Sequence, residues 1–269
     1  KAEMEPQNET VKAGIFSHYG YHMRDAEGHL TGYGIDFLNM ASKYSHINFD
    51  YVGYEKSWDE MLAMLEKGEI DVVTSARKLP EYEEKYAFSL PIGETSTVLS
   101  VQAEDERFQS EDYATYDGMR IGLMMGSRQN DRLKKFAEER GFSYEPVEYE
   151  NSSQLAGALK DGSIDAILTS DLRKTENERT LDTLITEDFY AIVRKGDEEL
   201  LNEINYAISQ MDANEGDWSN DMLYKYYGPV FSSGLTFTER EKSYIQDVIS
   251  GNKSITVTAM GDRSPYSYV

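Results

Sequence analysis

One pattern occurs twice in the chain, and it constrains the fold more than any other feature of the sequence. Residues 65–73 read Leu-Glu-Lys-Gly-Glu-Ile-Asp-Val-Val, and residues 159–167 read Leu-Lys-Asp-Gly-Ser-Ile-Asp-Ala-Ile. The glycine in each copy is typical of a helix end, because glycine adopts left-handed backbone angles without steric cost. The apolar run that follows is typical of a strand buried in a parallel sheet. The repeat therefore predicts two lobes of similar construction.

The segments around the repeat alternate between predicted strands and predicted helices. Alternation of this kind favours an α/β fold with parallel sheets and right-handed crossovers. The predicted strands cover residues 11–16, 47–52, 70–74, 98–101, 119–124, 144–149, 164–168 and 190–193, and the predicted helices cover residues 35–41, 58–67, 131–140, 154–160, 198–211 and 218–227.

Length and charge narrow the possible functions. The chain has 269 residues, which suits two lobes better than one small core. Its formal net charge of −22 argues against nucleic acid or an anionic membrane surface as a partner, because both would repel it. The absence of cysteine excludes disulfides and thiolate metal sites. No apolar run approaches the ~20 residues that span a bilayer. We expect the chain to be a piece of a longer protein.

Several short motifs together resemble one known family. They lie at residues 28–36 (Gly-His-Leu-Thr-Gly-Tyr-Gly-Ile-Asp), 58–71, 88–91 (Phe-Ser-Leu-Pro), 116–122 (Tyr-Asp-Gly-Met-Arg-Ile-Gly) and 225–228 (Lys-Tyr-Tyr-Gly). Over residues 11–228 the chain resembles the bacterial extracellular solute-binding proteins of family 3, also known as periplasmic binding proteins of type II or Venus flytrap modules. The resemblance implies a two-lobed α/β fold in which each lobe is a mostly parallel sheet flanked by helices.

The same resemblance implies a ligand cleft between the lobes and two hinge crossings of the chain. We expect the crossings near residues 92–96 and 186–190. Lobe I would then comprise residues 11–95 and 187–230, and lobe II residues 96–186.

The C-terminal residues suggest a second module. Pro-Tyr-Ser-Tyr at residues 265–268 resembles Gly-Tyr-His-Met at residues 20–23, and residues 237–245 have a helix-capping pattern from Thr238 to Glu241. We therefore expect a linker helix at residues 231–253 and the truncated start of a second flytrap module at residues 254–269. Alternatively, residues 254–269 form one further strand of this domain.

The resemblance also indicates where a ligand would bind. The family usually holds the ligand's carboxylate with a Thr and an Arg, and those positions fall on Leu79 and Tyr82. The usual partner of the ligand's amino group, an Asp, falls on Ser170, next to Asp171. The family's charged anchors are therefore missing or displaced, and Arg77 or Arg128 could replace them.

Other candidates come from their positions in the predicted elements. The resemblance implies that Trp58 stacks over the ligand and that Tyr19 supplies another ring. Residues 75–77 leave the end of a parallel strand, where α/β sheets bind ligands. Residues 127–128 begin a helix, whose free N–H groups suit an anion. Trp58 could equally be a core residue, Ser127 a helix cap, and both arginines solvated surface charges. The predicted ligand-binding residues are Tyr19, Trp58, Ser75, Ala76, Arg77, Ser127, Arg128, Ser170 and Asp171.

No catalytic, cofactor or metal site is predicted. Residues 75–78 match the Ser-x-x-Lys pattern of penicillin-recognising enzymes, but no Lys-Thr-Gly partner follows. His18 and His22 have no set of acidic or histidine partners, so we expect exposed histidines rather than a zinc site.

Tandem flytraps are typical of membrane sensor proteins such as histidine kinases and diguanylate cyclases. We therefore expect a non-enzymatic sensor module that binds a small polar ligand (an amino acid, amine, short peptide or carboxylate) on the extracellular or periplasmic side of a bacterial membrane. Its partners would be the following flytrap module and a membrane-anchored signalling domain. The alternatives are the solute receptor of an uptake transporter, an enzyme resembling cyclohexadienyl dehydratases, and a degenerate module that binds nothing.

Overall fold

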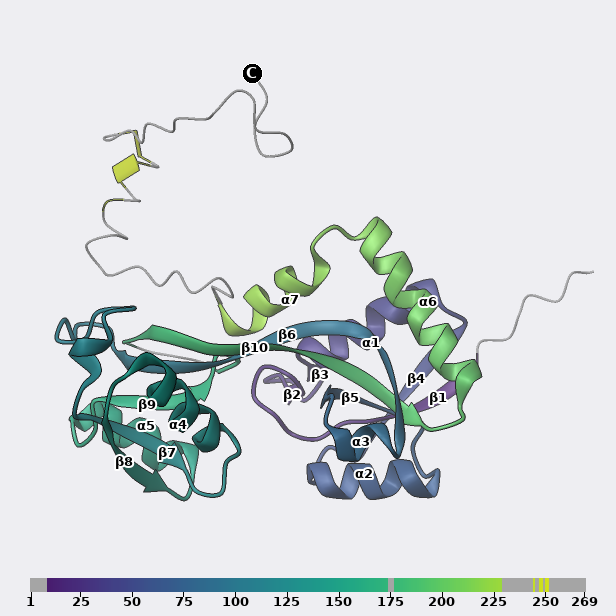
Figure 1. Cartoon of the computed structure of the whole chain (residues 1–269). Coiled ribbons are helices and arrows are strands. Elements are labelled where there is room, and N and C mark those ends of the chain that lie inside the picture. The colour runs from purple at the N-terminus through teal and green to yellow at the C-terminus, as the bar shows by residue number, and fades with distance from the viewer. Residues whose placement is uncertain (1–8, 174–176, 229–243, 245–246, 249, 252–269) are drawn as a thin grey trace, which may run out of the picture.

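The computed structural model describes residues 9–173, 177–228, 244, 247–248 and 250–251. Within these residues one sheet has the strand order β4-β1-β5-β10-β6-β9-β7-β8, and helices pack against both of its halves (Figure 1). The predicted second module at 254–269 lies outside the described residues. The predicted linker helix at 231–253 also lies outside them, apart from five scattered positions.

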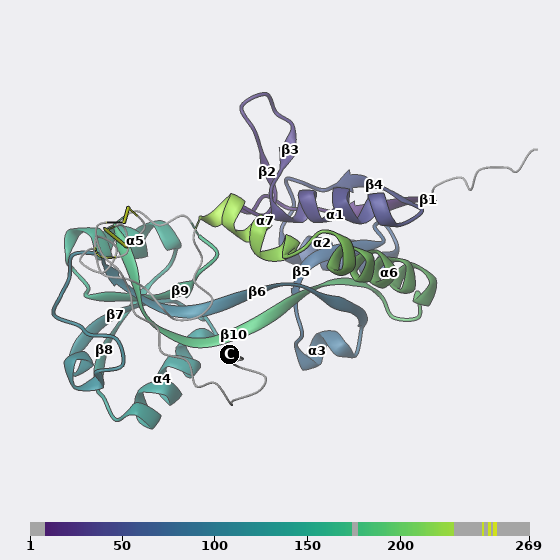
Figure 2. The same ribbon diagram turned by 90° about the horizontal axis from the view of Figure 1, so that it is seen from above.

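The first half of the sheet forms lobe I. Strand β1 (Glu9–Gly14) lies between β4 (Ile47–Val52) and β5 (Val72–Arg77) and is parallel to both. Val72 belongs to one apolar cluster and the adjacent Val73 to another, so both faces of the strand are buried. That burial explains the continuous apolar run in the sequence. A hairpin of β2 (Met23–Arg24) and β3 (Leu30–Thr31) projects from the lobe (Figure 2). The helices of this lobe are α1 (Tyr33–Tyr44), α2 (Trp58–Lys67), α3 (Pro80–Glu83), α6 (Glu198–Asn214) and α7 (Trp218–Tyr227).

The second half forms lobe II on the same plan. Strand β7 (Met119–Met124) lies between β8 (Tyr144–Tyr149) and β9 (Ala166–Ser170), again with parallel pairing. Helices α4 (Gln129–Arg140) and α5 (Ser152–Asp161) and the 3-10 turn η1 (Tyr113–Tyr116) complete the lobe.

Two long antiparallel strands connect the lobes. β6 (Tyr86–Gln102) and β10 (Glu178–Arg194) each have 17 residues and pair with one another from Tyr86↔Arg194 to Gln102↔Glu178. β10 also pairs with β5 in lobe I, and β6 with β9 in lobe II, so the chain crosses between the lobes along both strands (Figure 1). The two-lobed α/β fold with two crossings is thereby confirmed, while the lobe boundaries at 95/96 and 186/187 stay predictions.

The sequence underestimated these two strands, for which only 98–101 and 190–193 were predicted. Pro91 and Gly93 interrupt the apolar pattern of β6, and both residues disfavour a regular central strand. Register shifts at four places in the β6–β10 pairing disturb the alternation further. A strand that passes from one lobe to the other along its length has no single apolar periodicity from which it could be predicted.

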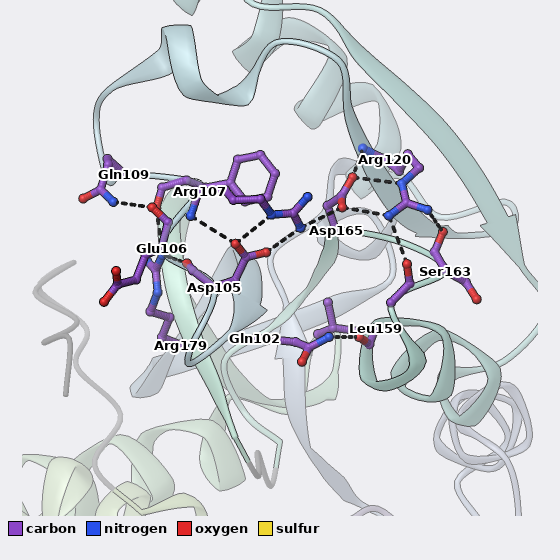
Figure 3. Close-up of polar contacts among 12 residues, drawn as sticks. Gln102, Asp105, Glu106, Arg107, Gln109, Arg120, Leu159, Ser163, Asp165 and Arg179 are labelled. Atoms are coloured by element: carbon purple, nitrogen blue, oxygen red, sulfur yellow. Dashed lines mark hydrogen bonds and ion pairs between the residues drawn. The ribbon is translucent and has the colours of Figure 1, made fainter.

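β5 and β9 begin two residues later than predicted, because the repeated aspartate comes before each strand. The backbone N–H of Asp71 donates to the Lys12 carbonyl, and that of Asp165 donates to the Arg120 carbonyl. The carboxylates accept in return, Asp71 from the Lys12 N–H at 2.9 Å and Asp165 from the Arg120 N–H at 3.0 Å (Figure 3). Each aspartate thus anchors the strand start to the central strand of its lobe.

Candidate functional site

A cavity of about 320 Å³ lies between the lobes. Lobe I supplies residues that follow β1, residues from the second half of β5 and residues from α2 and α7. The connecting strands supply Thr95 and Phe189, and lobe II supplies two residues at and beyond the end of β9. The carboxyl ends of parallel strands are the usual place for ligands in α/β sheets. The lining residues are Phe16, His18, Tyr21, Trp58, Ser75, Arg77, Thr95, Ser170, Leu172, Phe189 and Tyr227.

Aromatic rings form most of the lobe I wall. Phe16 and Trp58 meet edge to face with ring centroids 5.5 Å apart, and Tyr21 and Phe189 do so at 5.8 Å. The Trp58 indole N–H donates to the Tyr82 hydroxyl at 3.0 Å, which fixes the orientation of the ring. Oriented rings of this kind provide a large contact area and attract cations over their faces. The wall suits a solute with an apolar or cationic part.

Ser75 has an unusual backbone conformation at the cavity. Its φ of 66° lies in the left-handed region, which residues other than glycine rarely adopt. Such conformations persist only where surrounding structure imposes them, and they concentrate at functional sites. The strain is located in the second half of β5, at a residue that itself lines the cavity.

A charged cluster borders the cavity at the crossing between the lobes. Arg132 of α4 donates to both carboxylate oxygens of Glu187 on β10, each at 2.7 Å. The Arg77 guanidinium at the end of β5 lies 3.6 Å from the same carboxylate. The hydrogen bonds from Arg132 hold the pKa of Glu187 below its ordinary value, so the carboxylate is charged at neutral pH.

Hydroxyl groups from lobe II and from the crossing strand β6 face the cavity, and a carboxylate contacts them. Ser170 and Thr95 line the cavity, and their hydroxyl oxygens are 3.0 Å apart. Asp171 lies behind them and accepts from the Ser96 N–H at 2.9 Å and the Thr95 hydroxyl at 3.1 Å. Burial raises the pKa of Asp171, and these hydrogen bonds oppose that rise.

Four of the nine predicted residues line the cavity, namely Trp58, Ser75, Arg77 and Ser170. Asp171 contacts the lining residue Thr95 but does not itself line the cavity. The other four lie elsewhere in the structure. Ala76 is fully buried in the sheet opposite Tyr190, Tyr19 is 49% exposed, Ser127 accepts the Gln129 N–H at 3.2 Å, and Arg128 pairs with Glu81 at 2.6 Å.

Sequence reasoning missed seven lining residues. The aromatic run from Phe16 to Tyr21 could have been found, since it directly follows a predicted strand. Tyr227 and Phe189 carried no comparable signal, because a terminal helix and the long strand β10 bring them to the cavity from distant segments. The residues missed are Phe16, His18, Tyr21, Thr95, Leu172, Phe189 and Tyr227.

The positions where the resemblance implied a carboxylate anchor are used differently. Tyr82 accepts the Trp58 indole N–H and packs edge-on against Tyr86 with ring centroids 5.9 Å apart. Leu79 precedes the first turn of α3. Neither residue is among those that line the cavity.

The expectation of exposed histidines is wrong for His22. Its side chain is fully buried, its Nδ1 lies 3.2 Å from the Phe16 carbonyl, and burial lowers its pKa to about 3. His22 is therefore neutral at physiological pH. Within the described ranges no group of three metal-ligating side chains is arranged to hold a metal ion. In the same residues no helix is both long enough and apolar enough to cross a membrane.

Comparisons with known proteins agree with this architecture. The chain is 29% identical over 200 residues to the L-cystine-binding protein of Escherichia coli K12. The aligned region covers 69% of this chain and 70% of the relative. Among solved structures, a probable amino-acid ABC transporter extracellular-binding protein of Bacillus subtilis superposes with a TM-score of 0.72 at 20% identity, covering 82% of this chain and 98% of the other. The L-cystine solute receptor of Neisseria gonorrhoeae, in its unliganded open conformation, superposes with a TM-score of 0.67 at 21% identity, covering 83% and 94%.

A family-wide match extends over most of the chain. The model of the bacterial extracellular solute-binding proteins, family 3, matches residues 12–228, which include every residue of the cavity. The chain belongs to the bacterial extracellular solute-binding proteins of family 3.

Proposed function

We propose that the chain is the solute receptor of an uptake transporter and that it captures a small amino-acid-like solute in the cavity between its lobes. The observation that carries this proposal is the composition of the cavity: aromatic rings mostly from lobe I, the hydroxyl groups of Ser75, Thr95 and Ser170, and one guanidinium. A solute with a polar or charged end and a less polar body matches these groups. The cystine-binding and amino-acid-binding relatives support the same class of ligand.

Binding would favour approach of the two lobes. A solute that touches Trp58 on lobe I and Ser170 on lobe II gains both sets of contacts only when the lobes are close. A ligand shifts a conformational equilibrium only by its difference in affinity for the two states. The paired strands β6 and β10, which connect the lobes, are where such a hinge motion would occur.

The sensor function expected from the sequence stays a prediction. It depends on residues 231–269, of which only five positions are described. One relative is an L-cystine-binding protein, and one similar structure is that of a probable amino-acid ABC transporter extracellular-binding protein, so the uptake receptor is the function that we put forward.

A thermal-shift panel tests the proposal. The purified chain would be melted with L-cystine, L-arginine, L-histidine and L-glutamine in turn, because a ligand that binds only the folded state stabilises it, by roughly 2.7 kcal/mol at 100 times its Kd. We expect at least one of these amino acids to raise the melting temperature.

Two matched variants locate the effect. Ser170→Trp places a large side chain at the cavity and should abolish the shift, whereas Lys134→Trp, on the exposed surface of α4, should preserve it. A panel without any shift would contradict the proposal. A shift that survives Ser170→Trp would place the binding site elsewhere.

A further inference from the structure

Among the described residues that line the cavity, none carries a carboxylate, and Arg77 is the one with a permanent charge. The resemblance implied an aspartate for the ligand's amino group, but Ser170 occupies that position. An ammonium group in the cavity would therefore have no direct ionic partner among these residues. If the cavity holds such a group, the attraction has to come from another source.

The polar groups near Ser170 are already engaged with one another. The Ser170 hydroxyl oxygen accepts the Leu172 N–H at 3.1 Å and lies 3.0 Å from the Thr95 hydroxyl oxygen. Asp171 accepts from the Thr95 hydroxyl and from the Ser96 N–H. The three N–H donors of a primary ammonium would compete for acceptors that are in use, and donors left unpaired away from water are costly.

Aromatic rings supply most of the remaining wall. Phe16 and Trp58 lie at an interplanar angle of 69°, and Tyr21 and Phe189 lie at 73°. Neighbouring rings thus form walls that meet at steep angles instead of one flat stack. A cation within about 6 Å of a ring centroid is attracted by the negative face of the ring. We call the five lining rings the aromatic cage: Phe16, Tyr21, Trp58, Phe189 and Tyr227.

Within the described part of the chain, no lysine or arginine lies over a ring of the aromatic cage. Such cation–ring contacts do occur elsewhere, over Tyr54, Phe88, Phe108, Tyr113, Phe136 and Tyr226. The Trp58 ring is already oriented by its hydrogen bond to Tyr82. Burial raises the pKa of Tyr227, and the charge of Asp171 adds to that rise, so negative charge from behind the wall reaches the cage.

We propose that the aromatic cage binds an N-methylated ammonium group. A trimethylammonium group keeps the positive charge, has no N–H donor to satisfy and presents methyl groups to the rings. It therefore matches a wall of ring faces that has no carboxylate. This inference rests on the proposed function and adds to it a ligand class: amino-acid-like solutes whose nitrogen is methylated.

The first test is a series of probes in which only the nitrogen changes. Isothermal titration calorimetry would measure glycine, sarcosine, N,N-dimethylglycine and glycine betaine, which carry from none to three methyl groups on the nitrogen. We expect the affinity to rise along the series, by about 10-fold or more in total. A site that held the ammonium through hydrogen bonds would give the opposite order.

An uncharged probe of the same shape separates charge from bulk. In 3,3-dimethylbutanoate a carbon atom replaces the nitrogen of glycine betaine, so the methyl groups stay and the positive charge is lost. We expect glycine betaine to bind about 3–30-fold more tightly, the range of a cation held over aromatic faces. Equal affinities would mean that apolar contact alone holds the group, which would overturn the cage.

Variants of two cage rings locate the effect. Trp58→Leu and Phe16→Leu keep an apolar side chain but remove a ring face, so each should reduce the preference for glycine betaine over 3,3-dimethylbutanoate about 3–10-fold. Trp58→Phe retains a ring and should lose less. Tyr206→Leu is the matched control, because Tyr206 is 55% exposed on α6, which supplies no lining residue. Melting curves without ligand would establish that each variant is folded.

The outcomes separate the two proposals. If neither the four amino acids of the thermal-shift panel nor the glycine series binds, the proposed function fails and this inference with it. If an amino acid of the panel binds but the affinity falls from glycine to glycine betaine, only the aromatic cage is overturned. The cage is also overturned if Trp58→Leu and Phe16→Leu keep the wild-type preference, as Tyr206→Leu should.

Discussion

The two lobes are alike at one end of their sheets and different at the other. At the similar end, Gly14 of β1 and Gly122 of β7 occupy matching places: a Cβ would lie 2.4 Å from Ile70 Cδ1 at Gly14 and 2.5 Å from Ile164 Cδ1 at Gly122. Ile70 and Ile164 are the isoleucines of the repeated pattern. The repeated pattern therefore reflects a shared packing arrangement, in which the isoleucine between a helix and the following strand packs against the glycine of the central strand.

The aspartates of the repeat add matching arginine contacts. Asp71 pairs with Arg194 at 3.1 Å, and that arginine also donates to the Ile70 carbonyl at 2.5 Å. Asp165 pairs with Arg120 at 2.8 Å, and that arginine donates to the Ser163 carbonyl at 2.7 Å (Figure 3). The two arginines come from different places in their lobes, β10 in one and the central strand β7 in the other. Both lobes therefore contain the same aspartate–arginine interaction, although the arginine comes from a different strand in each lobe.

At the other end the lobes diverge. Arg77 stands as far beyond Asp71 as Asp171 stands beyond Asp165, so equivalent positions carry opposite charges. Aromatic rings gather on the lobe I side of the cavity, whereas lobe II offers Ser170 and Leu172. Packing therefore constrains the repeated end of each lobe, while the cavity end is free to take residues suited to a ligand.

The largest effect is expected where the two lobes are most alike. Gly14→Val and Gly122→Val would each force side-chain atoms into contacts that are already closed, because the Cβ alone meets apolar atoms at 2.4 Å or 2.5 Å. Overpacking of this kind costs about 1–3 kcal/mol. Urea denaturation should show both variants destabilised by similar amounts. Sensitivity at only one of the two positions would break the equivalence of the lobes.

The next effect distinguishes the two aspartates. The Asp165 side chain is 7% exposed and pairs with both Arg120 and Arg107, whereas the Asp71 side chain is 28% exposed. The hydrogen bonds from Arg120 lower the pKa of Asp165 to about 2. Asp165→Asn should therefore cost on the order of 2 kcal/mol at neutral pH, and Asp71→Asn less. If denaturation curves showed the larger loss of stability for Asp71→Asn, the exposure of the aspartate would not determine how much each ion pair stabilises the fold.

The same aspartate gives a pH dependence with a definite sign. Because the pKa of Asp165 is lower in the folded state, at about 2, than its ordinary value of 3.8, its stabilisation is complete above pH ~4. The stabilisation is lost as pH falls toward 2. The stability difference between wild type and Asp165→Asn should shrink over that range, as measured by urea denaturation from pH 6 to the acid limit. A difference that stayed constant would contradict the assigned charge contact.

The smallest effect concerns the divergent end. Ser75 has a left-handed φ of 66°, and Thr169, at the equivalent place in lobe II, is not among the residues with positive φ. Ser75→Gly should relieve strain and raise the free energy of unfolding slightly, by less than about 1 kcal/mol once the greater freedom of glycine in the unfolded chain is subtracted. Thr169→Gly should instead lower stability by roughly 1 kcal/mol. A loss of stability at both positions would contradict the assignment of backbone strain to Ser75.

The sequence predicted correctly those elements whose ends are marked by neighbouring residues, and it predicted poorly those that depend on distant contacts. α2 was predicted with its observed bounds, because Ser57 and Glu60 form a capping box at its start and Gly68 follows its end. Strands β6 and β10 were largely missed, because they continue through two environments and through Pro91.

The site divided in the same way. Trp58, Ser75, Arg77 and Ser170 were found because each stands at the start or end of an element that the sequence marks clearly. The placement of Phe189 and Tyr227 beside them is a tertiary result, which depends on how β10 and α7 return to lobe I. The burial of His22 likewise depends on packing against Phe16 and was not visible from spacing.

We expect an amino-acid-like solute to occupy the cavity between the lobes, and the two tryptophans of the chain allow a direct measurement of its binding. Trp58 lines the cavity, whereas Trp218 is buried against Phe37 with ring centroids 5.9 Å apart. Fluorescence titration of Trp218→Phe, which leaves Trp58 as the reporter, should show a saturable change with L-cystine or L-arginine, and Trp58→Phe should show none. A saturable change reported by Trp218 and not by Trp58 would contradict the account.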